Sequence, residues 1–261
     1  MSVGGLPDVY TLRARIMPVL IVSIPVALMA FALVPQALGT WSGFGIGGAV
    51  WLGVSAILAQ AGRDAGRRRQ IDLFKLWDGS PTTKRLRHRE TQNATQLQRR
   101  HAQLAAITGL TLPTSEEEAH DPAKADEIYE TCGSVMREKT RDRKLFDVVF
   151  DENCSYGFRR NLWGLKPFGV AVGTAVLVVA AGYVGVGFVR TGIFTASDPL
   201  IAVAIVCVIA LLGWSFVTPC WVRLPADAYA EALLAACERV MAGKPAQSKR
   251  SRTTSQTRGR T

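Results

Sequence analysis

The residues best suited to bind a ligand form a basic stretch near the middle of the chain. Four cations and one histidine fall within six positions there: Lys84, Arg85, Arg87, His88 and Arg89. The preceding hydroxyls of residues 82 and 83 would stand near a helix N-terminus, where anions bind. The stretch therefore predicts an anion site, for phosphate, a nucleotide-like ligand or nucleic acid. Such a patch also attracts anionic lipid headgroups, by about 1 kcal/mol per basic residue, and that alternative stays open.

A second group with chemical potential is acidic. Asp147 and Asp151 lie four residues apart, a spacing that puts both carboxylates on one helical face, where they could share a divalent cation. Asp142 and Glu152 lie nearby, but no histidine or third ligand is placed to complete a site. We therefore expect paired surface carboxylates, with no metal and no cofactor.

Recognised catalytic motifs are missing from the sequence. It contains no GxSxG, HExxH, P-loop or GxGxxG pattern. Its five cysteines are scattered without a CxxC pair, so no disulfide framework is implied. These observations favour a non-enzymatic protein, with a membrane-embedded enzyme kept as an alternative.

An aromatic and basic stretch precedes the third long apolar run. Aromatic and cationic side chains at such a position anchor a helix at the level of the lipid headgroups. The predicted membrane-interface anchors are Tyr156, Phe158, Arg159, Arg160, Trp163 and Lys166.

The elements that would position these groups are long apolar runs. Between Ile16 and Gly62 there is no charged residue and no histidine, and about 20 apolar residues suffice to cross a bilayer. The pattern predicts spans at residues 16–34 and 43–60, and a second pair at 167–189 and 199–222. We therefore expect an all-α polytopic membrane protein, with four transmembrane helices in two hairpins flanking a helical cytoplasmic domain.

The predicted spans hold no ionisable group, which argues against an ion-coupled transporter; a pore built from several copies stays open. Prolines 18 and 25 free backbone carbonyls that neighbouring helices or hydroxyls must satisfy. Small residues spaced four or more apart let helices approach closely. The predicted packing positions, used between spans rather than for a dimer face, are Gly43, Gly47, Gly53, Gly169 and Gly173.

Lysine and arginine distribution predicts the topology. Basic residues flank the ends of both hairpins at Arg13 and Arg15, at Arg63, at Lys166 and at Arg223. The positive-inside rule then places both termini and the central segment in the cytoplasm, with the protein in the inner membrane. A small-x-small pattern at residues 30–32 resembles a signal-peptide cleavage site, but the apolar run continues past it, so we expect no cleavage.

The segment 63–166 is expected to be helical, without alternating strand patterns. Helices are predicted to continue from span two to Trp77, and at residues 94–108, 122–140 and 143–153, with a loop at 111–121. Residues 63–100 carry eleven basic and four acidic residues, and residues 101–152 carry six basic and twelve acidic. These halves are expected to form a solvated face or to pair with each other, within one chain or between subunits.

The chain ends are expected to be simpler. Residues 1–15 form a cytoplasmic arm, residues 223–242 an amphipathic helix on the membrane or against the bundle, and residues 243–261 a disordered basic tail.

The expected function is a membrane protein whose cytoplasmic domain binds a protein partner or anionic ligand and couples that state to the spans. The alternatives are an anchor or assembly protein and an enzyme. Expected partners are the bilayer, anionic headgroups and further copies of the chain.

Overall fold

The computed structural model describes residues 8–34, 40–91, 93–193 and 197–243, and every regular element in that part of the chain is helical. The predicted all-α class is therefore confirmed. The elements in chain order are the π-helix η1 Thr11–Ile16, α1 Met17–Leu33, α3 Trp41–Leu76, α4 Pro81–Lys84, the 3-10 helix η2 His88–Glu90, α5 Ala94–Thr108, α6 Ser115–His120, α7 Pro122–Lys139, α8 Asp147–Thr191, α9 Asp198–Phe216, α10 Pro219–Ala235 and α11 Cys237–Ala242.

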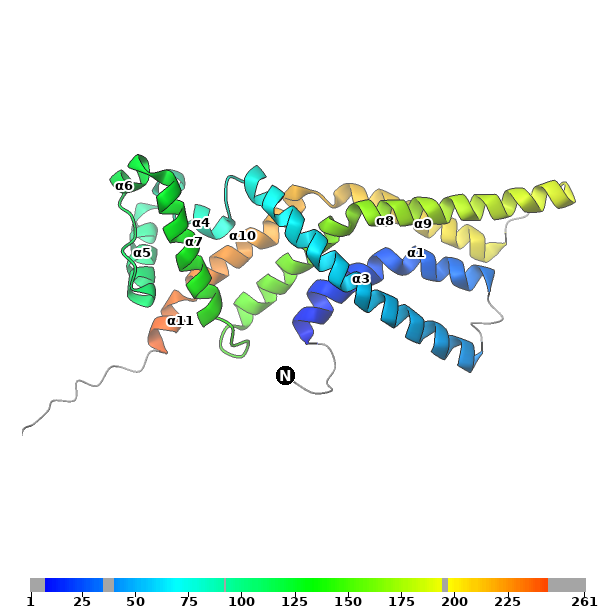
Figure 1. Cartoon of the computed structure of the whole chain (residues 1–261), viewed down its shortest axis with the longest axis horizontal. Coiled ribbons are helices and arrows are strands. Elements are labelled where there is room, and N and C mark those ends of the chain that lie inside the picture. Colours follow the sequence, from blue (N-terminus) through cyan, green and yellow to red (C-terminus); the bar gives the residue numbers. More distant parts are fainter. Residues whose placement is uncertain (1–7, 35–39, 92, 194–196, 244–261) are drawn as a thin grey trace, which may run out of the picture.

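The molecule is elongated. At one end lies a head formed by α4 to α7, α11 and the second half of α10, and the apolar helices α1, α8 and α9 extend to the other end (Figure 1). Helix α8 has 45 residues, which at 1.5 Å each gives about 67 Å. A bilayer's hydrocarbon core is about 30 Å thick, so α8 is long enough to cross it and still reach into the head.

Three helices among the described residues are long and apolar enough to cross a membrane: Thr11–Leu33, Asp147–Thr191 and Asp198–Phe216. The predicted third span lies within the second of these helices, and the predicted first and fourth spans overlap the other two. The predicted span at 43–60 forms the first half of α3 and is not one of these three. Side chains at residues 41, 42, 44 and 46 of α3 are outside the described part.

The core of the head is built from two distant parts of the sequence. Leu104, Tyr129 and Met136 are fully buried there against Leu233 and Cys237, which come from α10 and α11. The predicted amphipathic helix therefore packs against the bundle and is part of its core. Consequently residues 63–166 do not complete the head without residues from the C-terminal helices.

Local sequence signals explain most helix boundaries in the head. Helix α5 has the predicted bounds, with Asn93 accepting a hydrogen bond from the backbone N–H of Gln96 at its start. Ser80 caps α4 by accepting a hydrogen bond from the backbone N–H of Thr83. The expected loop at 111–121 was wrong in its second half, because Thr114 and Glu117 form a reciprocal capping box that starts α6.

Two predicted boundaries also need correction. The helix expected at 143–153 begins at Asp147 and runs on without a break as α8. Helix α9, which corresponds to the fourth predicted span, ends at Phe216 rather than at residue 222. Thr218 caps a new helix there, α10, with Pro219 at its first position. Predictions for residues 1–7, 35–39 and 244–261, which include the basic tail, fall outside the described residues.

Candidate functional site

The predicted anion-binding stretch is divided by the fold into two groups with different surroundings. Arg87 is only 3% exposed and faces carboxylates rather than solvent. Its Nε and Nη2 donate to the two carboxylate oxygens of Asp126 at 2.8 and 2.7 Å, and its Nη1 donates to Asp78 and Glu90. This bidentate geometry is the strongest form of an arginine–carboxylate pair. Arg87 is therefore used internally.

His88 and Arg89 are tied to a buried carboxylate, Glu118, which is 2% exposed. Glu118 accepts from the backbone N–H groups of both residues at 2.8 and 3.2 Å, and from Arg89 Nη1 at 2.9 Å. The hydroxyl of Tyr129 donates a further bond of 2.8 Å. The pairing expected between the two charged halves thus occurs within one chain, through α6 and α7.

Burial and hydrogen bonding shift several pKa values in this cluster. Burial would raise the pKa of Glu118, but bonds from His88, Tyr129 and Arg89 outweigh it and hold this pKa below its ordinary value. Burial raises the pKa of Tyr129, and its bond to Glu118 adds to the effect. Burial lowers the pKa of His101, whose Nε2 lies 2.8 Å from the carbonyl of Leu86. His101 is therefore favoured in its neutral form.

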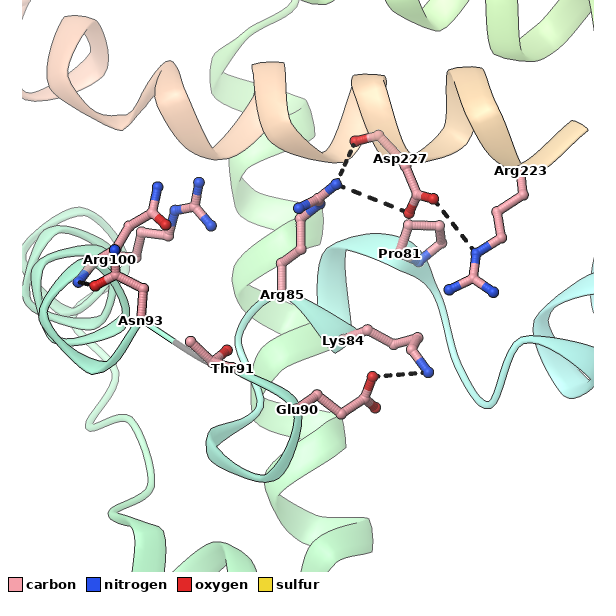
Figure 2. Close-up of a pocket in the computed structure, with 10 residues that line it drawn as sticks. Pro81, Lys84, Arg85, Glu90, Thr91, Asn93, Arg100, Arg223 and Asp227 are labelled. Atoms are coloured by element: carbon pink, nitrogen blue, oxygen red, sulfur yellow. Dashed lines mark hydrogen bonds and ion pairs between the residues drawn. The ribbon is translucent and has the colours of Figure 1, made fainter. Parts of the chain in front are cut away.

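Lys84 and Arg85, the other two predicted residues, line an open cavity of about 430 Å³. Two cations that the sequence did not suggest share this cavity, Arg100 from α5 and Arg223 from α10 (Figure 2). Arg223 reaches Lys84 and Arg85 through the packing of α10 against α4, which the sequence alone did not indicate. The structure thus brings two of the five predicted residues together with two further cations around one cavity.

The predicted membrane-interface anchors on α8 contact neighbouring helices of the same chain. Arg159 Nη1 donates to the carbonyl of Trp221 at 2.9 Å, and its guanidinium lies over the Trp221 ring. Proline has no N–H, so Pro225 leaves the carbonyl of Trp221 unpaired within α10. Lys166 Nζ donates to the carbonyl of Val217, at the end of α9, at 2.9 Å. These cations stabilise helix carbonyls that lack a partner in their own helix.

The remaining anchors of this segment are also engaged. Arg160 donates to Gln70 of α3 at 2.7 Å, and the Tyr156 ring stacks on that of Tyr229. Phe158 and Trp163 pack against a buried cluster that includes Val19, Leu165 and Trp214, with Arg69 over the Trp163 ring. Their contacts within the chain do not depend on lipid, and anchoring at the headgroups stays a prediction.

Asn161, which the sequence analysis did not single out, connects α8 to the N-terminal helix η1. It is 1% exposed, and its Nδ2 donates to the carbonyl of Ala14 at 2.7 Å. Pro18 cannot donate to that carbonyl four residues earlier, so Asn161 supplies a partner for it. The sequence contains a proline in the first apolar run and an asparagine before the third. It does not show that the two helices pack together, so this hydrogen bond could not be predicted.

The predicted packing glycines differ in their surroundings. A methyl group added to Gly173 would approach Leu211 of α9 to 3.2 Å, and one added to Gly169 would overlap Trp214. One added to Gly53 would meet nothing within 4 Å. Gly43 and Gly47 are half-buried. Glycines 169 and 173 therefore permit the approach of α9 to α8, while Gly53 faces open space.

The close crossing of α3 and α8 uses glycines that were not predicted. A methyl group on Gly164 of α8 would lie 2.7 Å from the backbone nitrogen of Gly66 on α3. Such a distance means that the two backbones touch, which only residues without a Cβ allow. The pair Gly62 and Gly66 forms a GxxxG pattern that was hidden because it runs past the end of the uncharged stretch.

The acidic group does not assemble a metal site. Asp151 pairs with Arg13 at 2.8 Å, and Asp147 lies 3.8 Å from Arg239. Within the described ranges no three histidine, cysteine or carboxylate residues are grouped to hold an ion. The five cysteines are free, and Cys132, Cys154, Cys207 and Cys237 are buried.

Comparison with family models, with curated proteins and with solved structures gave no match to this chain. Functional inference therefore rests on the physical features above.

Proposed function

We propose that this chain is a non-enzymatic inner-membrane protein that couples the state of its cytoplasmic head to its membrane helices. In this proposal four spans form two hairpins, 16–34 with 43–60 and 167–189 with the apolar helix ending at Phe216. Both termini and the head lie in the cytoplasm, on the side of the flanking arginines. The head binds a partner protein or an anionic ligand.

The observation that carries this proposal is the unbroken length of α8. Val149, in the first turn of that helix, is buried in the head core, and the same helix continues to Thr191 at the far end of the molecule. Between them, Arg159 and Lys166 tie it to α9 and α10. A continuous helix transmits displacement along its axis, whereas a flexible linker would not. This favours coupling over a passive anchor.

The topology is tested with reporters active only outside the cytoplasm. A fusion after Thr261 should give no signal, and one inserted at Thr195 should give a strong signal. The opposite pattern, or equal signals, would refute the proposed orientation.

The coupling is tested without any ligand. Asp227→Asn with Glu231→Gln removes the carboxylates by which α10 binds Arg85 and Arg100 of the head. Hydrogen exchange should then quicken in residues 156–166 and in the last turn of α9, with the outer half of α8 unchanged. A matched pair on exposed sites, Glu127→Gln with Glu130→Gln, should change nothing there. Exchange that quickens only inside the head would leave an anchor protein as the better description.

A further inference from the structure

The cavity lined by Lys84 lies where two neighbouring elements of the head meet the first half of α10, which is distant from both in sequence. Its walls come from α4 and the following turn, from the start of α5, and from the first half of α10 (Figure 2). A volume of about 430 Å³ lies within the range of small-ligand sites, which are about 300–1,000 Å³. The lining residues are Pro81, Lys84, Arg85, Glu90, Thr91, Asn93, Gln96, Arg100, Arg223 and Asp227.

Positive charge is in excess around this cavity. Lys84 pairs with Glu90 at 2.8 Å and Arg223 with Asp227 at 3.4 Å. Arg85 and Arg100 share Glu231, with a longer contact of 4.0 Å from Arg85 to Asp227. Four cations thus face three carboxylates. This arrangement favours an anionic ligand over a cationic one.

The cavity cations keep faces that are free to bind, in contrast to Arg87. The side chains of Arg85 and Arg223 are 34% and 46% exposed, against 3% for Arg87. Arg85 Nε is buried and has no hydrogen-bond partner in the described part of the chain. Most buried polar atoms are paired, so an unpaired guanidinium nitrogen is an unusual feature of this wall.

A second feature of the wall suits an anion. Asn93 and Gln96 belong to the N-terminal end of α5, a helix of 15 residues. Helix N-termini carry a partial positive charge and unpaired N–H groups. Guanidinium groups also match the oxygen geometry of phosphate, to which they can donate two parallel hydrogen bonds. The size of the cavity, its excess positive charge and its hydrogen-bond donors therefore all favour a small anion with several oxygen acceptors.

We propose that this cavity binds a phosphate group, presented either by a lipid headgroup or by a free phosphorylated molecule. Lys84, Arg85 and Arg223 are its main ligands, and Arg100 sets the position of Arg85 through Glu231. The inference rests on the proposed function and names the ligand class of the head. A phosphate there would hold α4 and α5 to α10, which leads directly from the last membrane helix.

The test uses the full chain in micelles of dodecyl maltoside, a neutral detergent without phosphate. Inorganic phosphate is titrated in one arm, and phosphatidylglycerol is added to the micelles in the other, with bound lipids counted by native mass spectrometry. Saturable binding in the first arm identifies a free phosphate, and binding only in the second identifies a headgroup. Lys84→Gln with Arg223→Gln should weaken either by about tenfold or more.

A matched control separates a site from diffuse attraction. Arg99→Gln with Arg239→Gln removes the same charge from exposed positions outside the cavity wall, where Arg99 pairs with Glu238 and Arg239 with Asp147. This control should bind like the unaltered chain. An equal loss in both double variants, or no saturable binding in either arm, would overturn the proposal. Unchanged circular dichroism of each variant shows that the loss is not unfolding.

The outcome is separable from that of the proposed function. The reporter fusions and the α10 exchange experiment involve no phosphate, so they can succeed while binding fails. Conversely, phosphate binding without any effect on exchange in residues 156–166 would keep the site and reject the coupling.

Discussion

The head and the polar segment of α8, residues 156–166, both hold cations that are partly or fully buried, but these cations have different partners. In the head, Arg87 and Arg89 meet the carboxylates of Asp126 and Glu118. In the α8 segment, Arg159 and Lys166 meet backbone carbonyls of Trp221 and Val217. In the head, cations form ion pairs with carboxylates. In the α8 segment, cations donate hydrogen bonds to backbone carbonyls at a helix end or four residues before a proline.

This difference predicts different sensitivities. A carboxylate partner can be protonated, and its loss leaves a buried charge without compensation. A carbonyl partner does not titrate, so the α8 segment depends on shape and on donor position rather than on pH. Perturbations of charge should therefore act on the head, and perturbations of helix contact on the α8 segment.

The largest effect is expected from Arg87→Ala. It leaves Asp126 and Glu90 facing each other without their shared cation, which should cost about 3–5 kcal/mol of unfolding free energy, as for broken buried pairs. Thermal unfolding can be followed with a thiol-reactive dye, because four of the five cysteines are buried. Arg99→Ala, at a pair whose arginine is 67% exposed, should cost less than about 1 kcal/mol. Equal effects would show that burial of the pair does not matter.

The next largest effect is expected where α3 crosses α8. Gly164→Ala places a methyl group 2.7 Å from the Gly66 backbone, so the helices must separate, at about 1–3 kcal/mol. Gly53→Ala is the matched control, since its methyl group would meet nothing within 4 Å. The same thiol-dye assay should show a lowered melting temperature for the first variant only. An unchanged melting temperature for Gly164→Ala would mean that the backbones of α3 and α8 are not in contact at this crossing.

Asn161→Leu should have an intermediate effect. It replaces the amide with an apolar group of the same branching, so the buried carbonyl of Ala14 loses this donor, at about 1–2 kcal/mol. Hydrogen exchange should quicken in residues 11–18 of the N-terminal helix, with the head unchanged. Arg160, which also contacts Asn161, provides the comparison: Arg160→Gln removes a part-buried bond to Asn161 but leaves the bond to Ala14, so it should change little in residues 11–18. Faster exchange in the head instead would contradict the separation of the two regions.

Local patterns were sufficient for much of the fold. The apolar runs predicted the three membrane-length helices, and the spacing of apolar residues predicted the bounds of α5. Such features depend on neighbours within a few residues, so they are visible in sequence. The capping box that starts α6 was equally visible in Thr114 and Glu117 and was missed because the surrounding acidic run was taken for a loop.

The candidate site was not predictable to the same degree. A run of basic residues carries no information about which of them will meet carboxylates, because Glu118 and Asp126 reach it only when α6 and α7 fold back. Likewise Arg223 joins Lys84 only through the packing of α10 on α4. These contacts span long sequence distances, and a single sequence gives no measure of them.

The smallest and most selective effect is expected from pH. The pKa of His101 lies below its ordinary value of 6.5, so the unfolded chain takes up a proton before the folded one as pH falls through 6.5. Head stability should therefore decrease below that pH. The groups around this ring are His88, Tyr129, the carbonyl of Leu86 and Glu118, and His88 adds repulsion once charged.

A second loss should follow at lower pH. The pKa of Glu118 lies below its ordinary value of 4.5, so its stabilising bonds are fully present above 4.5 and are lost below it. Hydrogen exchange at pH 7.5, 5.5 and 4.0, corrected for intrinsic rates, should quicken in α5 to α7 in two steps and stay constant in residues 156–166. His101→Gln should remove the first step alone. A matching acid response in the α8 segment would remove the distinction between carboxylate and carbonyl partners, because carbonyls have no proton to gain in this range.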